Sequence, residues 1–420
     1  MFQPLLKNRY LFFQAKIEVQ PFGKNKGTYW IILMLLAFRQ KPYFCGMIIP
    51  SIVWTICFGL FCAIIVIQLF YYGYFFLRLA NFIPTVQTNT VEHPVSIVIC
   101  ARDEAHNLVK NLPGVLVQNY KTTHEVVLVN DNSSDESKYV IEEFKRSFKN
   151  LNMVELTQEA IMITGKKFPL SMGIKSAKYE IVLLTDADCV PASEYWIQKM
   201  QDTYSDDIEI VLGYGAYHKQ PGLLNKLIRF ETFHTAIQYL SYAIAGTPYM
   251  GVGRNLSYKK NVFLRNKGFS SINQIPSGDD DLFINQVANA TNTAISIDPD
   301  TFTLSDSKKT WSEWLSQKYR HYTTSKYYQP KHKFLLGLYS LSLFLLYPFL
   351  VVNMIFFNWW IALAVFGVRF IVQAVIYFKT MKKLNESDLF PWFLLLDIWM
   401  FFYFIFTAPA IWKAPRKNWN

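Results

Sequence analysis

Long apolar stretches alternate with segments of mixed polarity and divide the chain into membrane-like and soluble parts. The first such stretch starts at Met47 and carries no charge before Arg78. A helix of about 20 apolar residues crosses a bilayer, so this stretch is predicted to form a transmembrane helix over residues 47–80. Three later stretches, within residues 334–412, are also long enough to cross a membrane; they cover residues 334–357, 359–378 and 390–412.

The segment of residues 92–305 has the alternating pattern of an α/β domain. Short runs rich in valine and isoleucine are separated by helix-like stretches, and the clearest runs are Val95–Cys100, Val126–Asn130 and Ile181–Thr185. Runs that are apolar throughout favour a buried, parallel sheet. Since ligands of open α/β sheets bind beyond the carboxyl ends of the strands, we expect the functional site at that edge.

The flanking segments have distinct characters. Residues 1–46 are predicted to be an N-terminal extension that is either interfacial or an over-extended start ahead of Met47. Residues 306–333 contain a predicted amphipathic helix over Thr310–Tyr322, whose aromatic residues, with lysines beside them, suit the headgroup region of a membrane. Residues 413–420 form a basic tail.

Basic residues beside the apolar block predict the orientation of the protein. Because cytoplasmic loops carry an excess of lysine and arginine, lysines next to the block place the α/β domain on the cytoplasmic face of the cytoplasmic membrane. The basic tail disagrees with this orientation, since four crossings would place it outside. The lysines concerned are Lys331, Lys333, Lys379, Lys382 and Lys383.

Composition supports a membrane protein. The chain has 420 residues, of which 51% are hydrophobic and only 17% charged, which is too apolar for a set of soluble domains. Lysine and arginine exceed aspartate and glutamate by 42 to 31, an excess that basic loops at a membrane explain, so nucleic-acid binding is not implied. The five cysteines form no Cys-X-X-Cys pair, and neither a disulfide framework nor structural zinc is predicted.

Acidic residues follow the clearest strands, where a ligand would bind. They stand in Arg102-Asp103-Glu104 after the first strand, in Asp131–Asp135 after the second and in Asp186-Ala187-Asp188 after the third. Capping of the next helix explains one such residue, but not carboxylates at both of the first two strand ends. Carboxylates suit the N–H and hydroxyl donors of a nucleoside. Two carboxylates two residues apart repel each other unless a cation lies near, and Mg²⁺ or Mn²⁺ with a bound diphosphate suits them.

Several motifs follow one another in a set order along the chain. They are VSIVICARDEA, VVLVNDNSSD, GKKFPLSMGIKSA, VLLTDADCV, SGDDDLF and QKYRH, and they cover residues 95 to about 325. This order resembles that of membrane-integrated family 2 glycosyltransferases, similar to processive polysaccharide synthases and ceramide-type glucosyltransferases. The resemblance implies a catalytic domain of the GT-A fold, which is Rossmann-like α/β, flanked by transmembrane helices. It also implies a nucleotide-diphosphate sugar as donor, with UDP as the expected nucleotide.

The resemblance assigns the donor site to residues at the strand ends. Asp131 would accept the imide N–H of uracil, and Glu104 would lie near the nucleoside. Lys166 would approach the base or the diphosphate. Asp186 would contact the ribose or a metal-bound water, and Asp188 would ligate Mg²⁺ or Mn²⁺.

The segment SGDDDLF resembles the family motif Thr-Glu-Asp-X-Asp-Leu, which places the general base at Asp279 and puts Gly278 where the family has glutamate. Because of this departure, Asp280 is the alternative candidate for the general base. An inverting transfer needs a carboxylate that accepts the proton of the acceptor hydroxyl as it attacks the anomeric carbon. Repulsion among adjacent aspartates should raise the pKa of at least one of them. An acidic N-terminus for the helix from about Leu282 is the alternative explanation.

The segment Gln317–His321 matches the family motif Gln-X-X-Arg-Trp, with His321 in place of the tryptophan. Arg320 would donate to the diphosphate and stabilise the leaving group, and Gln317 joins it in the catalytic set. The family tryptophan helps to line the acceptor site, so its replacement puts the identity of the acceptor in doubt. The resemblance places the acceptor beside Asp281, Gly251, Gly253 and His321.

The predicted function is an inverting, metal-dependent transfer of a sugar from a nucleotide-diphosphate donor to a membrane-associated polysaccharide or lipid. The Gln-X-X-Arg motif favours a processive synthase, whereas the replaced tryptophan and the four predicted helices favour a single addition to a lipid. The expected partners are the donor, the acceptor and membrane lipids. A catalytically silent glycan- or nucleotide-binding component of an export complex is disfavoured because every acidic motif is retained. A nucleotidyltransferase is disfavoured because its basic, glycine-rich signature does not follow the first strand.

Overall fold

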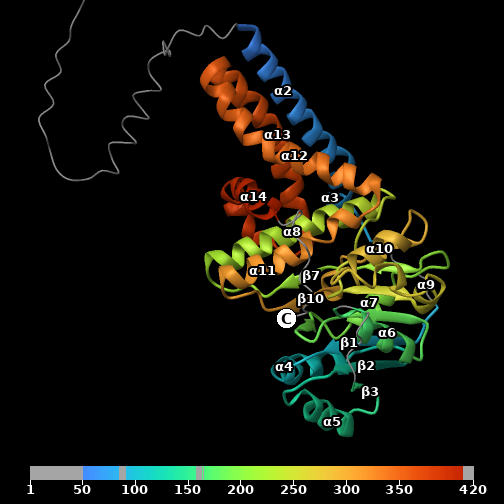
Figure 1. The fold of residues 1–420 in the computed structure, drawn as a ribbon. Coiled ribbons are helices and arrows are strands. Elements are labelled where there is room, and N and C mark those ends of the chain that lie inside the picture. The colour runs from blue at the N-terminus through green and yellow to red at the C-terminus, as the bar shows by residue number, and fades with distance from the viewer. Residues whose placement is uncertain (1–50, 85–90, 158–162, 164, 410–420) are drawn as a thin grey trace, which may run out of the picture. The chain divides into compact units, whose positions relative to one another are not determined.

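The computed structural model describes residues 51–84, 91–157, 163 and 165–409. They form an α/β domain and a set of long apolar helices (Figure 1). The predicted N-terminal extension of residues 1–46, the basic tail of residues 413–420 and the end of the last predicted transmembrane helix lie outside the described residues.

A seven-stranded sheet with the strand order β3-β2-β1-β4-β8-β6-β9 forms the centre of the α/β domain, and a three-stranded sheet has the order β5-β10-β7. The strands β3, β2, β1 and β4 are parallel neighbours, as predicted, whereas β8 is antiparallel to both β4 and β6. Because β6 and β9 are parallel to each other and β6 is antiparallel to β8, six strands share one direction, and the expectation of a parallel sheet is wrong for β8 alone. The strands are β1 (Val95–Ala101), β2 (His124–Asp131), β3 (Leu151–Leu156), β4 (Ile181–Leu184), β5 (Cys189–Pro191), β6 (Ile210–Leu212), β7 (Gly215–Tyr217), β8 (Leu256–Lys259), β9 (Thr293–Ile295) and β10 (Thr303–Ser305).

The direction of β8 brings a further loop to the carboxyl edge of the sheet. Leu184, at the end of β4, pairs with Leu256, at the start of β8. Residues 251–255, which precede β8, therefore lie at the edge where β4 ends, and the hydroxyl of Thr185 donates to the carbonyl oxygen of Arg254 over 3.0 Å. A parallel strand would have placed this loop at the opposite edge.

Alternate residues of β1 face two hydrophobic cores, because successive side chains of a strand point to opposite faces of the sheet. Ile97 belongs to one core together with Leu112 of α4, while Val98 belongs to the other together with Ile174 of α6. Helices thus cover both faces of the sheet. The helices between β1 and the long apolar helices are α4 (Ala105–Leu116), α5 (Ser137–Ser147), α6 (Lys167–Ser176), α7 (Trp196–Gln201), α8 (Leu223–Ile244), α9 (Lys260–Arg265), α10 (Asp281–Val287) and α11 (Trp311–Tyr322).

Three helical stretches of the described residues are long and apolar enough to cross a membrane: Ile52–Ala80, Pro330–Lys383 and Ser387–Thr407. They contain α2 (Ser51–Phe70), which continues through a π-helical segment (Tyr71–Phe76) into α3 (Leu77–Ala80), and also α12 (Pro330–Asn353), α13 (Trp359–Lys383) and α14 (Phe393–Thr407). This finding agrees with the prediction of a membrane protein.

The second of these stretches reverses direction at Asn358. The backbone of this residue is extended, with φ −155° and ψ 113°, and its side chain accepts hydrogen bonds from the backbone N–H groups of Trp360 and Ile361. α12 and α13 consequently run side by side (Figure 1). They correspond to the helices predicted at 334–357 and 359–378, and the number of membrane crossings stays a prediction.

Candidate functional site

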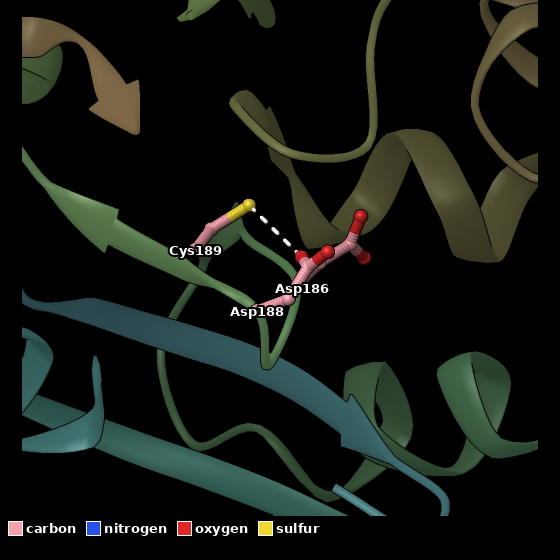
Figure 2. Close-up of side chains that lie close together, drawn as sticks. All are labelled: Asp186, Asp188 and Cys189. Carbon is pink, nitrogen blue, oxygen red and sulfur yellow. Dashed lines mark hydrogen bonds between the residues drawn. The ribbon is translucent and has the colours of Figure 1, made fainter. Parts of the chain in front are cut away.

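The loop between β4 and β5 carries two carboxylates at the carboxyl edge of the sheet. One candidate ligand atom from each of Asp186, Asp188 and Cys189 lies within 4.8 Å of the others, and Figure 2 shows the three side chains gathered at this loop. The thiol of Cys189 donates to Oδ1 of Asp188 over 3.3 Å, and burial raises the pKa of this thiol well above its usual value. Since Mg²⁺ and Mn²⁺ bind oxygen in preference to a protonated thiol, the two carboxylates are the candidate metal ligands.

The two carboxylates differ in how their charge is offset. Lys166, which immediately precedes α6, forms an ion pair with Asp186. Burial would raise the pKa of Asp186, but the charges of Lys166 and Arg254 hold it below its usual value. Asp188 forms no ion pair with a described residue, and burial together with the charge of Asp186 raises its pKa. A divalent cation would stabilise the ionised form of Asp188, so this pair of carboxylates fits a metal ion.

Arg254 is a cation of the site that the sequence analysis missed. Its guanidinium donates to the carbonyl oxygen of Gly215 over 2.8 Å and to the hydroxyl of Ser305 over 2.9 Å, and it lies 4.3 Å from the ring centroid of Tyr217. These contacts satisfy the guanidinium of this half-buried cation. Its place in the stretch before β8 was visible in the sequence, but the antiparallel direction of that strand, which brings it to Asp186, was not.

The loops after β1 and β2 are tied to each other by two acidic residues. Oδ1 of Asp103 accepts hydrogen bonds from the backbone N–H of Ser134 over 2.6 Å and from its hydroxyl over 3.0 Å. Oδ2 of Asp135 accepts from the backbone N–H of Ala105, the first residue of α4, over 3.0 Å. Asp103 also has a φ of 56°, which is uncommon for a residue other than glycine. Asp103 and Asp135 therefore stabilise the loops after β1 and β2 by hydrogen bonds between them.

Glu104 and Asp131 are better placed to meet a ligand. Burial, with the charges of Asp188 and Asp186 nearby, raises the pKa of Glu104, although Asn107 donates a hydrogen bond to it over 2.5 Å. Asp131 ends β2 and is buried, with one oxygen 3.9 Å from the guanidinium of Arg102. Glu104 thus lies close to the candidate metal ligands. Asp131 lies close to Arg102, a cation that follows the neighbouring strand β1.

The buried thiol of Cys100, at the end of β1, marks the point at which distant residues meet. Burial raises the pKa of this thiol to about 12. Four charged side chains from four separate segments lie near enough to act on it as well: Lys166, Asp186, Asp279 and Asp131. The structure therefore brings these predicted site residues together at one edge of the sheet.

The adjacent aspartates before and at the start of α10 have different surroundings. Oδ1 of Asp280 accepts from the backbone N–H of Asp281 over 2.7 Å, and Oδ2 accepts from that of Gly253 over 2.8 Å. Burial and the charges of Asp279 and Asp281 raise the pKa of Asp280 to about 8. Asp279, by contrast, forms no hydrogen bond or ion pair with any other described residue. Asp279 is therefore the carboxylate of this segment that is open to a ligand.

Asp281 and Gly278 have roles in holding this segment in place. Asp281 is buried, and its Oδ2 accepts from the hydroxyls of Thr324 over 2.5 Å and Tyr328 over 2.8 Å. Gly278 has a φ of +100°, and a Cβ added to it would lie 2.4 Å from a side-chain atom of Leu282. This backbone excludes the glutamate that the family motif has at the position of Gly278.

The glycines assigned to the acceptor site are placed differently from each other. Gly251 is buried, and an added Cβ would lie 3.0 Å from the side chain of Leu256 and 3.2 Å from that of Ile284. Gly253 instead donates its N–H to Asp280. Of the two glycines, Gly253 is the one that contacts the aspartate segment.

Helix α11 brings the predicted Gln-X-X-Arg motif to the same edge. Arg320 lies near enough to Asp186 for its charge to lower the pKa of that carboxyl group. Gln317, about one turn earlier, has a buried Oε1 that accepts no hydrogen bond from the described residues. His321 belongs to α11, and its side chain lies outside the described part of the chain.

Comparisons with known proteins are consistent with this arrangement. Residues 96–264 match the model of the family described as glycosyl transferase family 2. The chain is 25% identical over 185 residues to the glycosyltransferase AglE of Haloferax volcanii, a match that covers 44% of this chain and 56% of that protein. It is 33% identical over 96 residues to a poly-beta-1,6-N-acetyl-D-glucosamine synthase of Staphylococcus epidermidis, a match that covers 23% of this chain and 22% of that protein. The chain thus spans about half the length of the first relative and less of the second.

The fold is similar to that of the mannosyltransferase PcManGT from Pyrobaculum calidifontis, whose structure was solved in complex with GDP-Man and Mn²⁺. The TM-score is 0.53 at 17% sequence identity, and the superposition covers 83% of this chain and 99% of that one. At this identity the likeness concerns the fold, and the predicted GT-A fold is confirmed.

Proposed function

We propose that this protein transfers a sugar from a nucleotide-diphosphate donor, with UDP as the first candidate nucleotide, to a membrane-associated polysaccharide or lipid, because residues 96–264 match the model of glycosyl transferase family 2. The observation that carries the proposal is the convergence of Asp131, Lys166, Asp186 and Asp279 around the end of β1. A nucleoside, a diphosphate and a reacting sugar need carboxylates and cations at one place.

Asp186 and Asp188 are proposed to hold Mg²⁺ or Mn²⁺, directly or through water. When bound, such an ion neutralises negative charge on the diphosphate and makes it a better leaving group. The raised pKa of Asp188 supports this assignment, since a cation would stabilise the ionised carboxylate. The presence of Mn²⁺ with GDP-Man in the structure of PcManGT also supports an ion of this kind.

Asp279 is proposed to be the general base. It would accept the proton of the acceptor hydroxyl while that oxygen attacks the anomeric carbon from the face opposite the departing diphosphate, so that the configuration inverts. Asp280 is less suited to this role, because both its oxygens accept backbone N–H groups and its pKa is raised to about 8. Arg320 would donate to the leaving diphosphate as charge develops on it.

The remaining assignments concern the nucleoside and the acceptor. Asp131 and Glu104 are proposed to accept from the nucleoside, and Lys166 to approach the base or the diphosphate. The unpartnered Oε1 of Gln317 is proposed to accept from a hydroxyl of the acceptor, because a buried carbonyl oxygen without a donor is costly. The candidate membrane helices support an acceptor held at the membrane, and the lysines next to these helices are the reason for proposing that the catalytic domain lies on the cytoplasmic face.

A donor screen with the full chain in lipid nanodiscs tests the proposed function. Release of the nucleotide and the mass of the products would be measured for UDP- and GDP-sugars, with Mn²⁺ and after chelation. We expect turnover of at least one donor, its loss on chelation, and a decrease of at least about 100-fold in Asp188→Ala. Asp207→Ala, at an exposed position, is the matched control. A folded protein that turns over no donor would favour the catalytically silent alternative.

A further inference from the structure

A cleft of about 200 Å³ opens beside Asp188. Asn107 of α4 contributes to one wall, Lys308 and Lys309 contribute from the segment that joins β10 to α11, and Glu313 contributes from the first turn of α11. A group bound at Asp188 would therefore extend towards this segment. Lys308 also lies near enough to Glu104 for its charge to lower the pKa of that carboxyl group.

The two lysines of this cleft are not used in ion pairs. Neither Lys308 nor Lys309 forms an ion pair or a hydrogen bond with another described residue. Other lysines in the vicinity are occupied by carboxylates: Lys166 by Asp186, Lys110 by Asp306 and Lys318 by Glu231. The ammonium groups of Lys308 and Lys309 are thus available to an anion that enters the cleft.

The backbone that carries these lysines is held on both sides. On one side, Oδ2 of Asp306 accepts from Lys110 over 2.6 Å, and the buried hydroxyl of Ser307 accepts from Asn225 of α8 over 3.0 Å. On the other side, the hydroxyl of Thr310 accepts from the backbone N–H at the start of α11 over 3.3 Å. The backbone of this segment is therefore fixed next to the proposed metal ligand, which lowers the cost of ordering the two lysines around a ligand.

We propose that Lys308 and Lys309 bind a phosphate group of the donor diphosphate and hold it as it departs. This inference rests on the proposed function and adds two cationic side chains to that site. Asp186 and Asp188 carry two negative charges, whereas a divalent ion together with Lys166, which pairs with Asp186, carries three positive ones, so only one positive charge remains for the diphosphate. The negative charge that develops on the leaving diphosphate needs further cations. Lys308 and Lys309 line the cleft into which a diphosphate bound at Asp188 would extend.

The test compares Lys308→Gln/Lys309→Gln with Lys331→Gln/Lys333→Gln, in which two exposed lysines outside the cleft are replaced. Binding of UDP, UMP and uridine to the full-length proteins would be measured with Mn²⁺ and without acceptor, together with the donor KM. We expect the dissociation constant of UDP to rise by about tenfold in the first variant only, because charge-assisted hydrogen bonds to the phosphate are lost. Uridine should bind equally to both, and Lys308→Arg/Lys309→Arg should retain UDP affinity.

Two results would overturn the inference while leaving the proposed function intact. One is unchanged UDP affinity in a Lys308→Gln/Lys309→Gln protein that unfolds at the parent's temperature. The other is a raised acceptor KM with unchanged UDP affinity, which would assign the lysines to an anionic group of the acceptor instead. A parent protein that binds no nucleotide and turns over no donor would contradict the proposed function itself, and the inference with it.

Discussion

Lys318 of α11 and Glu231 of α8 form a buried ion pair, with side-chain exposures of 12% and 7%. The same glutamate accepts a hydrogen bond from the hydroxyl of Tyr403 in α14 over 3.2 Å. One carboxylate therefore joins three helices. Since Lys318 stands between Gln317 and Arg320, this pair fixes the part of α11 that reaches the candidate site.

Removing one member of this pair should slow the transfer of the sugar. Glu231→Gln would leave the Lys318 ammonium buried without a counter-charge, which typically costs about 3–5 kcal/mol of stability. We expect kcat to fall by about tenfold or more, with a smaller change in the donor KM, because Arg320 would no longer be held in position. Steady-state kinetics and thermal unfolding of the same protein would separate the two effects.

The double variant Glu231→Gln/Lys318→Met should be compared with the single variant. It removes both charges, so it should be more stable than Glu231→Gln but should not regain the full kcat of the parent. A Glu231→Gln protein with the parent's kcat would show that the pair has no influence on Arg320.

The two neighbouring aspartates that precede α10 should respond differently to the same substitution. Asp279→Asn removes the proposed base and should lower kcat by about 100-fold or more. Asp280→Asn keeps an oxygen that can accept from the N–H of Gly253 or Asp281, so its kcat should stay within about tenfold of the parent. The measurement is single-turnover transfer with saturating donor. If the larger loss occurs at Asp280 instead, the base is assigned to the wrong residue.

The stability of the protein should decrease as the pH rises from about 4 to about 8. Burial and neighbouring charges raise the pKa of Asp280 to about 8 in the folded protein, against a usual value of 3.8. Between these values the folded state holds a proton that the unfolded state has lost, so each pH unit costs at most about 1.4 kcal/mol. Thermal unfolding at several pH values, in parent and Asp280→Asn, checks this. The slope should be shallower in the variant, and equal slopes would contradict the prediction.

Arg369 of α13 and Asp397 of α14 form an ion pair of 2.7 Å among the apolar helices. Gln68 of α2 accepts from Nε of Arg369 over 2.6 Å, and the hydroxyl of Tyr347 in α12 donates to Asp397 over 2.6 Å. Four helices that are far apart in the sequence thus share one polar network. In an apolar environment such a network is costly to break.

Asp397→Asn should therefore lower the stability by about 3–5 kcal/mol, since Arg369 keeps its charge and loses its partner. Arg369→Leu/Asp397→Leu removes both charges and should be more stable than the single variant. Thermal unfolding in one detergent measures both. A single variant as stable as the parent would mean that the pair does not hold the helices together.

Much of the architecture was predictable from local patterns. Runs of valine and isoleucine located β1, β2 and β4, although β2 begins two residues earlier than predicted, at His124. Aromatic and polar residues at helical spacing located α11, and uncharged runs of sufficient length located the candidate membrane helices. These features depend on side-chain periodicity within one segment, which a sequence contains in full.

The differences among Asp279, Asp280 and Asp281 were not predictable, because the three side chains are chemically identical. Their roles differ through contacts with distant residues: Gly253 lies 27 positions from Asp280, and Thr324 lies 43 positions from Asp281. Arg254 was missed for the same reason, since the direction of a four-residue strand cannot be read from its composition.

The sequence by itself determined which kinds of segment this protein has, and which carboxylates end its parallel strands. Parallel neighbours end at one edge, so the meeting of those carboxylates followed from local pattern and topology together. Only the tertiary structure decided which charges are paired and which are left for a ligand. Pairing depends on distances between residues remote in the chain, and chain folding alone sets those distances.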